Sequence, residues 1–284
     1  MERLTEGYGL VEGPVWDPER GLLFSDVVNG GVFVVESGGR VREVIAHRRG
    51  IGGMTLHERG GLVVSGRNVA FKDFDGGPTV VLLDRDEAAG NVGYNDLTTD
   101  AMGRIYVGSL GSSPVFDDGR PPAAGDLFCI DLDGTSRRVG TGIRLTNGLA
   151  FSPDNRWLYH SDSIARTIWR YGVHEDGGLE EKEPFIRCER GAPDGLVVSE
   201  DGRIWAALAA GGAAVGIWND RGEAAGVLDV PQPMCTSVCF GGSDLRDLYV
   251  VTGSEGSGPN SGAVYVVKSV VAGLPVAAAR VAVD

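Results

Sequence analysis

The chain has 284 residues, of which 42% are hydrophobic and 23% are charged, and its formal net charge at pH 7 is -13. This composition is that of an ordinary globular protein and excludes fibrous and disordered classes. The negative charge repels phosphate backbones and anionic headgroups, so we expect neither nucleic acid nor a membrane surface as a partner.

One pattern recurs six times along the chain. Each copy reads as a short apolar strand, a turn rich in Asp, Gly or Pro, a second apolar strand, and a third apolar run. No window has the apolar spacing of an amphipathic helix, so we expect few helices. In chain order, the copies begin at Glu12, Gly52, Asn95, Asn147, Asp194 and Thr236, and their second strands begin at Gly21, Gly61, Gly103, Arg156, Gly202 and Asp247.

The period of the repeat sets the expected architecture. Copies begin about every 40–50 residues, which is typical of β-propeller blades. We therefore predict an all-β protein, a six-bladed β-propeller, with residues 1–284 as a single domain. A terminal segment, either residues 3–10 or the tail ending at Asp284, should close the ring by pairing with the last blade. The alternative is an irregular β-sandwich in which the spacing is coincidental.

The first residue of each copy is the candidate for chemistry. The innermost strands of a propeller run parallel around a central channel, so the six first residues should meet at one end of it. Four of them, Glu12, Asn95, Asn147 and Asp194, carry carboxylate or carboxamide oxygens. Such hard ligands suit Ca²⁺, Mg²⁺ or Mn²⁺, whereas Zn²⁺ more often collects His or Cys. The pattern indicates a divalent cation on the axis.

Two of these donors have an ordinary alternative interpretation. Asn147-Gly148 and Asp194-Gly195 can be β-turn elements, because Asx-Gly pairs are common in turns. Their shared register with the donors of the other copies favours the metal site. Two carboxylates and two neutral amides balance a divalent charge and leave the ion able to polarise a substrate oxygen.

Four stretches together point to a known family, although each is weak alone. They are Val11–Trp16, Asn95–Arg104, Thr146–Asp154 and Pro193–Trp205. Over nearly its whole length the chain resembles the gluconolactonase, regucalcin (senescence marker protein) and luciferin-regenerating enzyme family. The resemblance implies a six-bladed propeller with one catalytic divalent metal ion. Ca²⁺ is the first expectation, with Mg²⁺, Mn²⁺, Zn²⁺ or Fe²⁺ as alternatives.

The resemblance also implies roles for single residues. Glu12, Asn147 and Asp194 look like metal ligands, and Asp194 matches the family's catalytic carboxylate, acting as general base or, alternatively, as nucleophile. Asn95 matches a position that either binds the metal or holds the substrate through water. Asp96 is expected to orient water or substrate, unless it only caps a turn. Tyr94 is expected beside the substrate.

One position departs from the family. Many members that open aldonolactones carry Arg two residues before the Asn-Asp pair, where it contacts sugar hydroxyls, and this chain has Gly93 there. The departure predicts a lactone or ester less polar than a polyhydroxylated sugar lactone. The stretch from Leu110 to Ala124 should form a lid over the metal face, or else a plain connection between strands.

Several other features bear on location and on competing chemistries. Residues 1–13 contain no apolar run of signal-peptide length, and Cys129, Cys188, Cys235 and Cys239 form no C-x-x-C pair. These observations favour reduced thiols and a cytoplasmic location. The chain lacks the G-x-S-x-G motif of serine hydrolases and the H-E-x-x-H zinc motif.

The leading hypothesis is a divalent-metal-dependent lactonase, a carboxylic ester hydrolase that acts on a small molecule. One alternative is a phosphotriesterase-like hydrolase that uses the same metal site. Another is a non-catalytic propeller that binds calcium or a protein partner. The sequence leaves the oligomeric state open.

Overall fold

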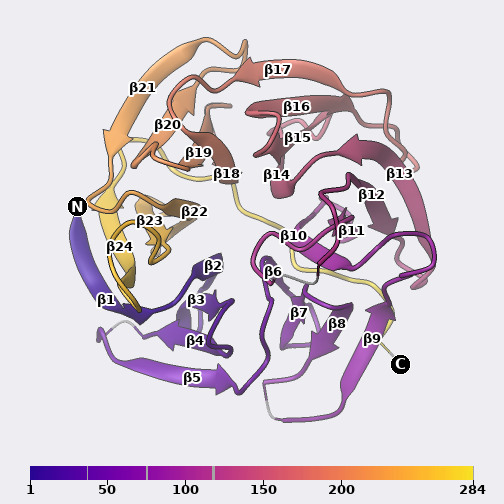
Figure 1. The fold of residues 1–284 in the computed structure, drawn as a ribbon, viewed down its shortest axis with the longest axis horizontal. Coiled ribbons are helices and arrows are strands. Elements are labelled where there is room, and N and C mark those ends of the chain that lie inside the picture. Colours follow the sequence, from indigo (N-terminus) through magenta and orange to yellow (C-terminus); the bar gives the residue numbers. More distant parts are fainter. Residues whose placement is uncertain (37, 75, 117–118, 284) are drawn as a thin grey trace.

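The fold is a ring of six sheets. The computed structural model describes residues 1–36, 38–74, 76–116 and 119–283. Within these ranges the strands form six four-stranded antiparallel sheets, and no residue lies in a helix. The sheets stand around a central channel (Figure 1), which confirms the predicted six-bladed β-propeller. None of the residues described belongs to a helix long and apolar enough to cross a membrane.

Five blades are each built from four consecutive strands, beginning at the inner one, and the sixth combines β22, β23 and β24 with β1. The strands are β1 (Glu2–Tyr8), β2 (Val11–Asp17), β3 (Gly21–Asp26), β4 (Val32–Val35), β5 (Val41–Ile45), β6 (Met54–Leu56), β7 (Leu62–Val64), β8 (Val69–Lys72), β9 (Thr79–Leu83), β10 (Gly93–Thr99), β11 (Ile105–Leu110), β12 (Gly125–Ile130), β13 (Ser136–Ile143), β14 (Thr146–Phe151), β15 (Trp157–Asp162), β16 (Thr167–Gly172), β17 (Glu183–Arg187), β18 (Ala192–Val198), β19 (Ile204–Ala209), β20 (Ala214–Trp218), β21 (Ala224–Asp229), β22 (Cys235–Gly241), β23 (Asp247–Thr252) and β24 (Gly262–Lys268).

The N-terminal segment closes the ring. Strand β1 pairs antiparallel with β24, with Arg3 opposite Tyr265, and becomes the outer strand of the last blade. The C-terminal tail instead runs beneath the inner strands in the view of Figure 1 and makes isolated bridges to Ser199 and His57. Asp284, the last residue of the predicted alternative, lies outside the described residues.

The hydrophobic core lies between neighbouring blades. Side chains of a strand alternate between its two faces, and each face of a blade meets the next blade. One cluster joins Val63 and Phe71 of the second blade to Leu97 and Val107 of the third. Burying one such side chain contributes about 1.5–3 kcal/mol. This packing fixes the inner edges of the blades at defined positions around the channel.

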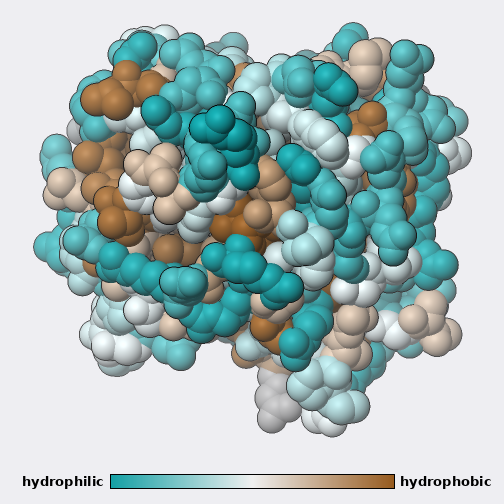
Figure 2. All heavy atoms as spheres, turned by 90° about the horizontal axis from the view of Figure 1, so that it is seen from above, coloured by the Kyte–Doolittle hydropathy of each residue, from teal (hydrophilic) through white to brown (hydrophobic). Residues whose placement is uncertain are grey.

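The outer surface is mainly hydrophilic. Seen edge-on, hydrophobic side chains form separate groups among hydrophilic ones (Figure 2). Scattered exposed apolar residues of this kind are normal in folded proteins. The distinctive polar groups of this chain lie inside the channel, where the six inner strands meet.

Candidate metal and substrate site

The four predicted oxygen donors lie on four inner strands at the same end of the channel. Glu12 is the second residue of β2 and Asn147 the second of β14, while Asn95 and Asp194 are the third residues of β10 and β18. Inner strands run parallel, so equivalent positions stand at the same height. The structure therefore brings the four side chains to one region, as the repeat predicts.

Breaks in the strand register accompany these positions. A regular strand would direct the side chains at the neighbouring blades. In β2 the pairing with β3 is irregular between Glu12 and Val15, directly after the donor, and in the strands that carry the other three donors a similar irregularity includes the donor itself. A bulge bends a strand and re-aims a side chain. We attribute the inward direction of the donors to these bulges, which the sequence pattern alone did not reveal.

Close approach of the inner strands explains why the second blade supplies no donor. Gly52 occupies the equivalent position there, and a Cβ on it would lie 1.9 Å from Oδ1 of Asn95. Gly148 is under the same constraint, because its Cβ would lie 2.7 Å from the carbonyl oxygen of Asp194. These two residues must be glycine for the donors of adjacent blades to come together.

Three carboxyl groups are enclosed near the axis. Glu12 is 9% exposed and Asp194 is 6% exposed. Burial, then the negative charges of Asp194 and Asp96, raises the pKa of Glu12 well above its ordinary value. Burial, then Asp96, likewise raises the pKa of Asp194. The three groups are close enough to repel one another, and no cationic side chain is among the causes of either shift.

An unsatisfied atom marks the same region. Among the described residues, Oδ1 of Asp194 is buried and has no hydrogen-bond partner. Leaving a buried polar atom unpaired costs about 1–3 kcal/mol, and more for a charged group. A cation beside Glu12 and Asp194 would remove both the repulsion and the unpaired oxygen.

Hydrogen bonds fix the orientation of the Asn147 amide. Its Nδ2 donates to Oγ of Ser163 at 2.7 Å, and that hydroxyl donates to the carbonyl oxygen of Pro193 at 2.7 Å. Its Oδ1 accepts a hydrogen bond of 2.6 Å from Nδ2 of Asn95. The amide oxygen is therefore held toward the other donors. Sequence reasoning missed Ser163, because it follows β15 and lies outside the repeated first position.

The Asn95 amide is positioned differently. Its Nδ2 donates to the carbonyl oxygen of Thr146 at 2.8 Å as well as to Asn147. Its oxygen lies on the side of Gly52. In this arrangement Asn95 anchors Asn147, and its assignment as a direct metal ligand stays a prediction.

The donor set fits a hard divalent cation. Two carboxylates and the oriented Asn147 oxygen are the ligand types that Ca²⁺, Mg²⁺ and Mn²⁺ prefer. Within the part of the chain that the structure describes, no three His, Cys, Asp or Glu side chains form a metal-holding group. A metal site here therefore needs neutral oxygen ligands, such as the Asn147 amide, beside the two carboxylates. The sixth first residue, Thr236, does not contribute, because its hydroxyl donates to the carbonyl oxygen of Val11.

A cavity of about 320 Å³ borders Asn95 and is the candidate substrate pocket. Of the four predicted donors, only Asn95 lines it. Residues of the predicted lid, including Pro114 and Phe116, line it too, whereas residues 117–118 lie outside the described ranges. The charged side chains among its described lining residues are all cationic and are those of Arg49, Arg67, Arg85 and Arg120. The expectation of a less polar substrate rested on Gly93, and the four arginines of this pocket weigh against it.

The two other predicted substrate contacts are placed less favourably. Tyr94 borders this pocket but is only 2% exposed, and its hydroxyl donates to the carbonyl oxygen of Asp84 at 2.9 Å. Burial raises the pKa of Tyr94 to about 12. Asp96 lines a different cavity, and burial raises its pKa to about 7. Both substrate roles stay predictions.

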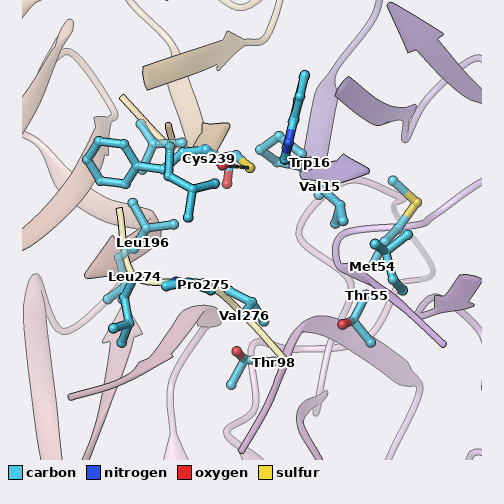
Figure 3. A pocket seen from close by; sticks show the side chains of 18 of the residues that line it. Val15, Trp16, Met54, Thr55, Thr98, Leu196, Cys239, Leu274, Pro275 and Val276 are labelled. Carbon is cyan, nitrogen blue, oxygen red and sulfur yellow. Dashed lines mark hydrogen bonds between the residues drawn. The ribbon is translucent and has the colours of Figure 1, made fainter. Parts of the chain in front are cut away.

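That second cavity lies at the opposite end of the channel and measures about 600 Å³. Its lining comes largely from the C-terminal halves of inner strands, such as Trp16 and Leu196. Leu274, Pro275 and Val276 of the C-terminal tail lie across it (Figure 3). Its walls are mainly apolar, so it lacks the convergent donors of the other end.

Comparisons with known proteins give the chain its family. The family model described as SMP-30/gluconolactonase/LRE-like region matches residues 10–254. The pentonolactonase of Haloferax volcanii is 35% identical over 88% of this chain and 84% of its own length. The 6-deoxy-6-sulfogluconolactonase of Pseudomonas putida is 30% identical over 87% of this chain and 84% of its own length.

A solved structure agrees in fold. The calcium-binding protein regucalcin from Agrobacterium tumefaciens superposes with a TM-score of 0.86 at 21% identity, covering 99% of this chain and 97% of that one. The fold, the repeated donors and the matched family model lead to the same conclusion. The chain belongs to the SMP-30/gluconolactonase/LRE-like family, as the resemblance in its sequence predicted.

Proposed function

We propose that this protein is a divalent-metal-dependent lactonase, with the metal held by Glu12, Asn147 and Asp194. The single observation that carries the proposal is the unpaired, buried Oδ1 of Asp194 beside a second buried carboxylate. Relatives named as lactonases support lactone opening as the reaction. Ca²⁺ is the ion we propose first, supported by the oxygen donors and by a fold neighbour named as calcium-binding.

Each residue then has a defined task. A bound divalent ion would supply Lewis acidity toward the substrate carbonyl oxygen and positive charge beside the carboxylates. Asp194 must be ionised to accept a proton from the attacking water, although burial and Asp96 raise its pKa. Glu12 adds the second negative charge of the site. Asn95 keeps the Asn147 oxygen in place and presents its own edge to the pocket.

The polarity of the substrate requires revision. Gly93 led to the expectation of a lactone with few polar groups. Because four arginines line the pocket beside Asn95, we do not carry that expectation into the proposal. A cytoplasmic location remains part of it, supported by four buried cysteines that form no disulfide in the structure described.

One experiment separates the proposed function from its alternatives. The purified protein is stripped with a chelator, reconstituted with Ca²⁺, Mg²⁺, Mn²⁺ or Zn²⁺, and assayed on a panel of lactones and a panel of organophosphate triesters. We expect lactone opening that disappears on stripping and returns with a divalent ion. Turnover of triesters alone would favour a phosphotriesterase, and metal binding without turnover of either panel would favour a binding protein.

A further inference from the structure

The pocket beside Asn95 has a charge opposite to that of the whole molecule. The chain carries a formal net charge of -13, yet Arg49, Arg67, Arg85 and Arg120 line this one cavity, and none of the described residues that line it is Asp or Glu. Four separate connections between strands bring these arginines to the pocket. A concave site of one sign focuses the field and attracts ligands of the other sign.

Two of the arginines are already paired. Nη2 of Arg85 lies 2.6 Å from one oxygen of Glu87, and Nη2 of Arg120 lies 2.7 Å from the other. Glu87 therefore compensates part of this pair's charge and holds both guanidinium groups at the rim.

In the described part of the chain, the other two arginines form no such ion pair, and Arg67 reaches Glu87 only through a weak charge interaction. Among the described residues, neither Arg49 nor Arg67 forms a hydrogen bond or an ion pair through its side chain. Arg48, the neighbour of Arg49, shows the contrast: its Nη2 donates to the carbonyl oxygen and to Oδ1 of Asn68. Arg49 and Arg67 thus keep their donors available toward the cavity that they line.

We propose that the substrate is an anionic lactone whose carboxylate or other oxyanion lies against Arg49 and Arg67 while its ring lies beside Asn95. This inference rests on the proposed function and names its substrate class. A guanidinium group presents a planar fork of donors that matches the oxygens of a carboxylate or phosphate. The cavity volume of about 320 Å³ is in the range of pockets that hold a small molecule.

The test uses two lactones that differ at one carbon. D-glucono-1,4-lactone ends in a hydroxymethyl group, and D-glucaro-1,4-lactone ends in a carboxylate. We expect the metal-loaded protein to show a kcat/KM at least about 10-fold higher for the anionic lactone at low ionic strength, with the preference falling as salt is added. A phosphorylated lactone in a third arm distinguishes a carboxylate from a phosphate pocket.

Variants assign the preference to the pocket. The double variant R49Q/R67Q should lose about 10-fold or more of the preference, measured as the ratio of kcat/KM for the anionic lactone to kcat/KM for the neutral one. R49K/R67K should keep part of the preference for the anionic lactone, because lysine retains the positive charge but not the planar fork of donors. The matched control is R42Q/R138Q, which removes two exposed arginines that pair with Glu36 and Asp126 away from the pocket. An unchanged ratio in R49Q/R67Q, or equal loss on both lactones, would overturn the inference.

A binding measurement separates this inference from the proposed function. Calorimetry with metal-stripped protein compares the affinities of the two lactones without turnover. If the anionic lactone binds more tightly and R49Q/R67Q abolishes the difference, the anion site stands even where no lactone is hydrolysed. If lactones are hydrolysed without any preference in rate or affinity, the proposed function stands and the anion site is refuted.

Discussion

The two ends of the central channel are built from the same six strands and differ in chemistry. At the end where the inner strands begin, Glu12 and Asp194 are buried with raised pKa values, and one carboxylate oxygen is unpaired. At the other end, residues such as Leu196 and Leu274 line a mainly apolar cavity crossed by the tail. The buried, mutually repelling carboxyl groups of the first end destabilise the fold, whereas the apolar packing of the second end stabilises it. Such local conflict is typical of a functional site in an otherwise consistent fold.

The largest contrast between the ends should come from Asp194→Asn. The amide keeps the shape of the side chain but removes the base and one negative charge, so kcat/KM on a lactone should fall about 10²–10⁴-fold. In metal-stripped protein the same change should leave Tm unchanged or raised, because it relieves repulsion with Glu12. Kinetics and thermal unfolding measure the two effects.

An exposed carboxylate in the same blade provides the control for this prediction. Asp220→Asn should change neither kcat/KM nor the effect of metal on Tm. An Asp194→Asn variant that retained more than about a tenth of wild-type activity would contradict the assignment of Asp194.

The next effect concerns the support of Asn147. Ser163→Ala removes the acceptor that holds Nδ2 of Asn147, and loss of such a supporting contact typically weakens metal binding about 10–100-fold. Ser161→Ala is the matched control, because Oγ of Ser161 is buried without a partner among the described residues. Ca²⁺ titration should separate the two variants. Equal affinities would show that Asn147 needs no support or is not a ligand.

A third difference lies in a buried histidine behind the donors. Nε2 of His160 is 2.6 Å from Oγ1 of Thr146, and burial lowers the pKa of His160 to about 3. An unfolded histidine titrates near 6.5, so its neutral form stabilises the fold fully above about pH 6.5, and this contribution is lost as the pH falls toward 3. Between pH 6.5 and 4, wild type should lose up to about 1.4 kcal/mol per pH unit more than His160→Gln.

Urea unfolding of both proteins at several pH values measures this slope. The acidic groups of the channel titrate in both proteins, so their contribution cancels in the difference. Parallel curves for wild type and His160→Gln would show that His160 is not held neutral.

The smallest effect should come from the apolar end. Leu274→Ala trims a half-buried side chain of the tail and should cost about 1 kcal/mol of stability. Because the tail lies away from the donors, kcat/KM should stay within about twofold. Urea unfolding measures the loss of stability, and a lactone assay measures kcat/KM. A large loss of activity at unchanged stability would show that the apolar end also serves the reaction, which would contradict the division between the two ends.

Much of this division could be predicted from the sequence. The repeat located all six inner strands, and their shared register brought Glu12, Asn95, Asn147 and Asp194 together. The sequence pattern did not reveal the features that orient these side chains toward the channel. The bulges recur in the donor strands, but residue types alone do not show where a strand bends, and the hydroxyl of Ser163 lies outside the repeated position.

The pocket shows the same limit. Arg49 and Arg67 lie in separate connections, and only the folded ring brings them to one cavity. The absence of one arginine, at Gly93, was therefore a poor guide to the charge of the mouth. Ring closure also depended on geometry, since the sequence left open which terminal segment pairs with the last blade.

The most direct test of the account is the stoichiometry of Ca²⁺ binding to metal-stripped protein, measured by calorimetry beside Asp194→Asn and Glu12→Gln. One ion per chain should bind wild type and stabilise it, by roughly 2.7 kcal/mol when free Ca²⁺ is 100 times the Kd. Both variants should lose this site while remaining folded. Binding that survives unchanged in both variants, or no binding of any divalent ion by wild type, would contradict a metal site formed by Glu12, Asn147 and Asp194.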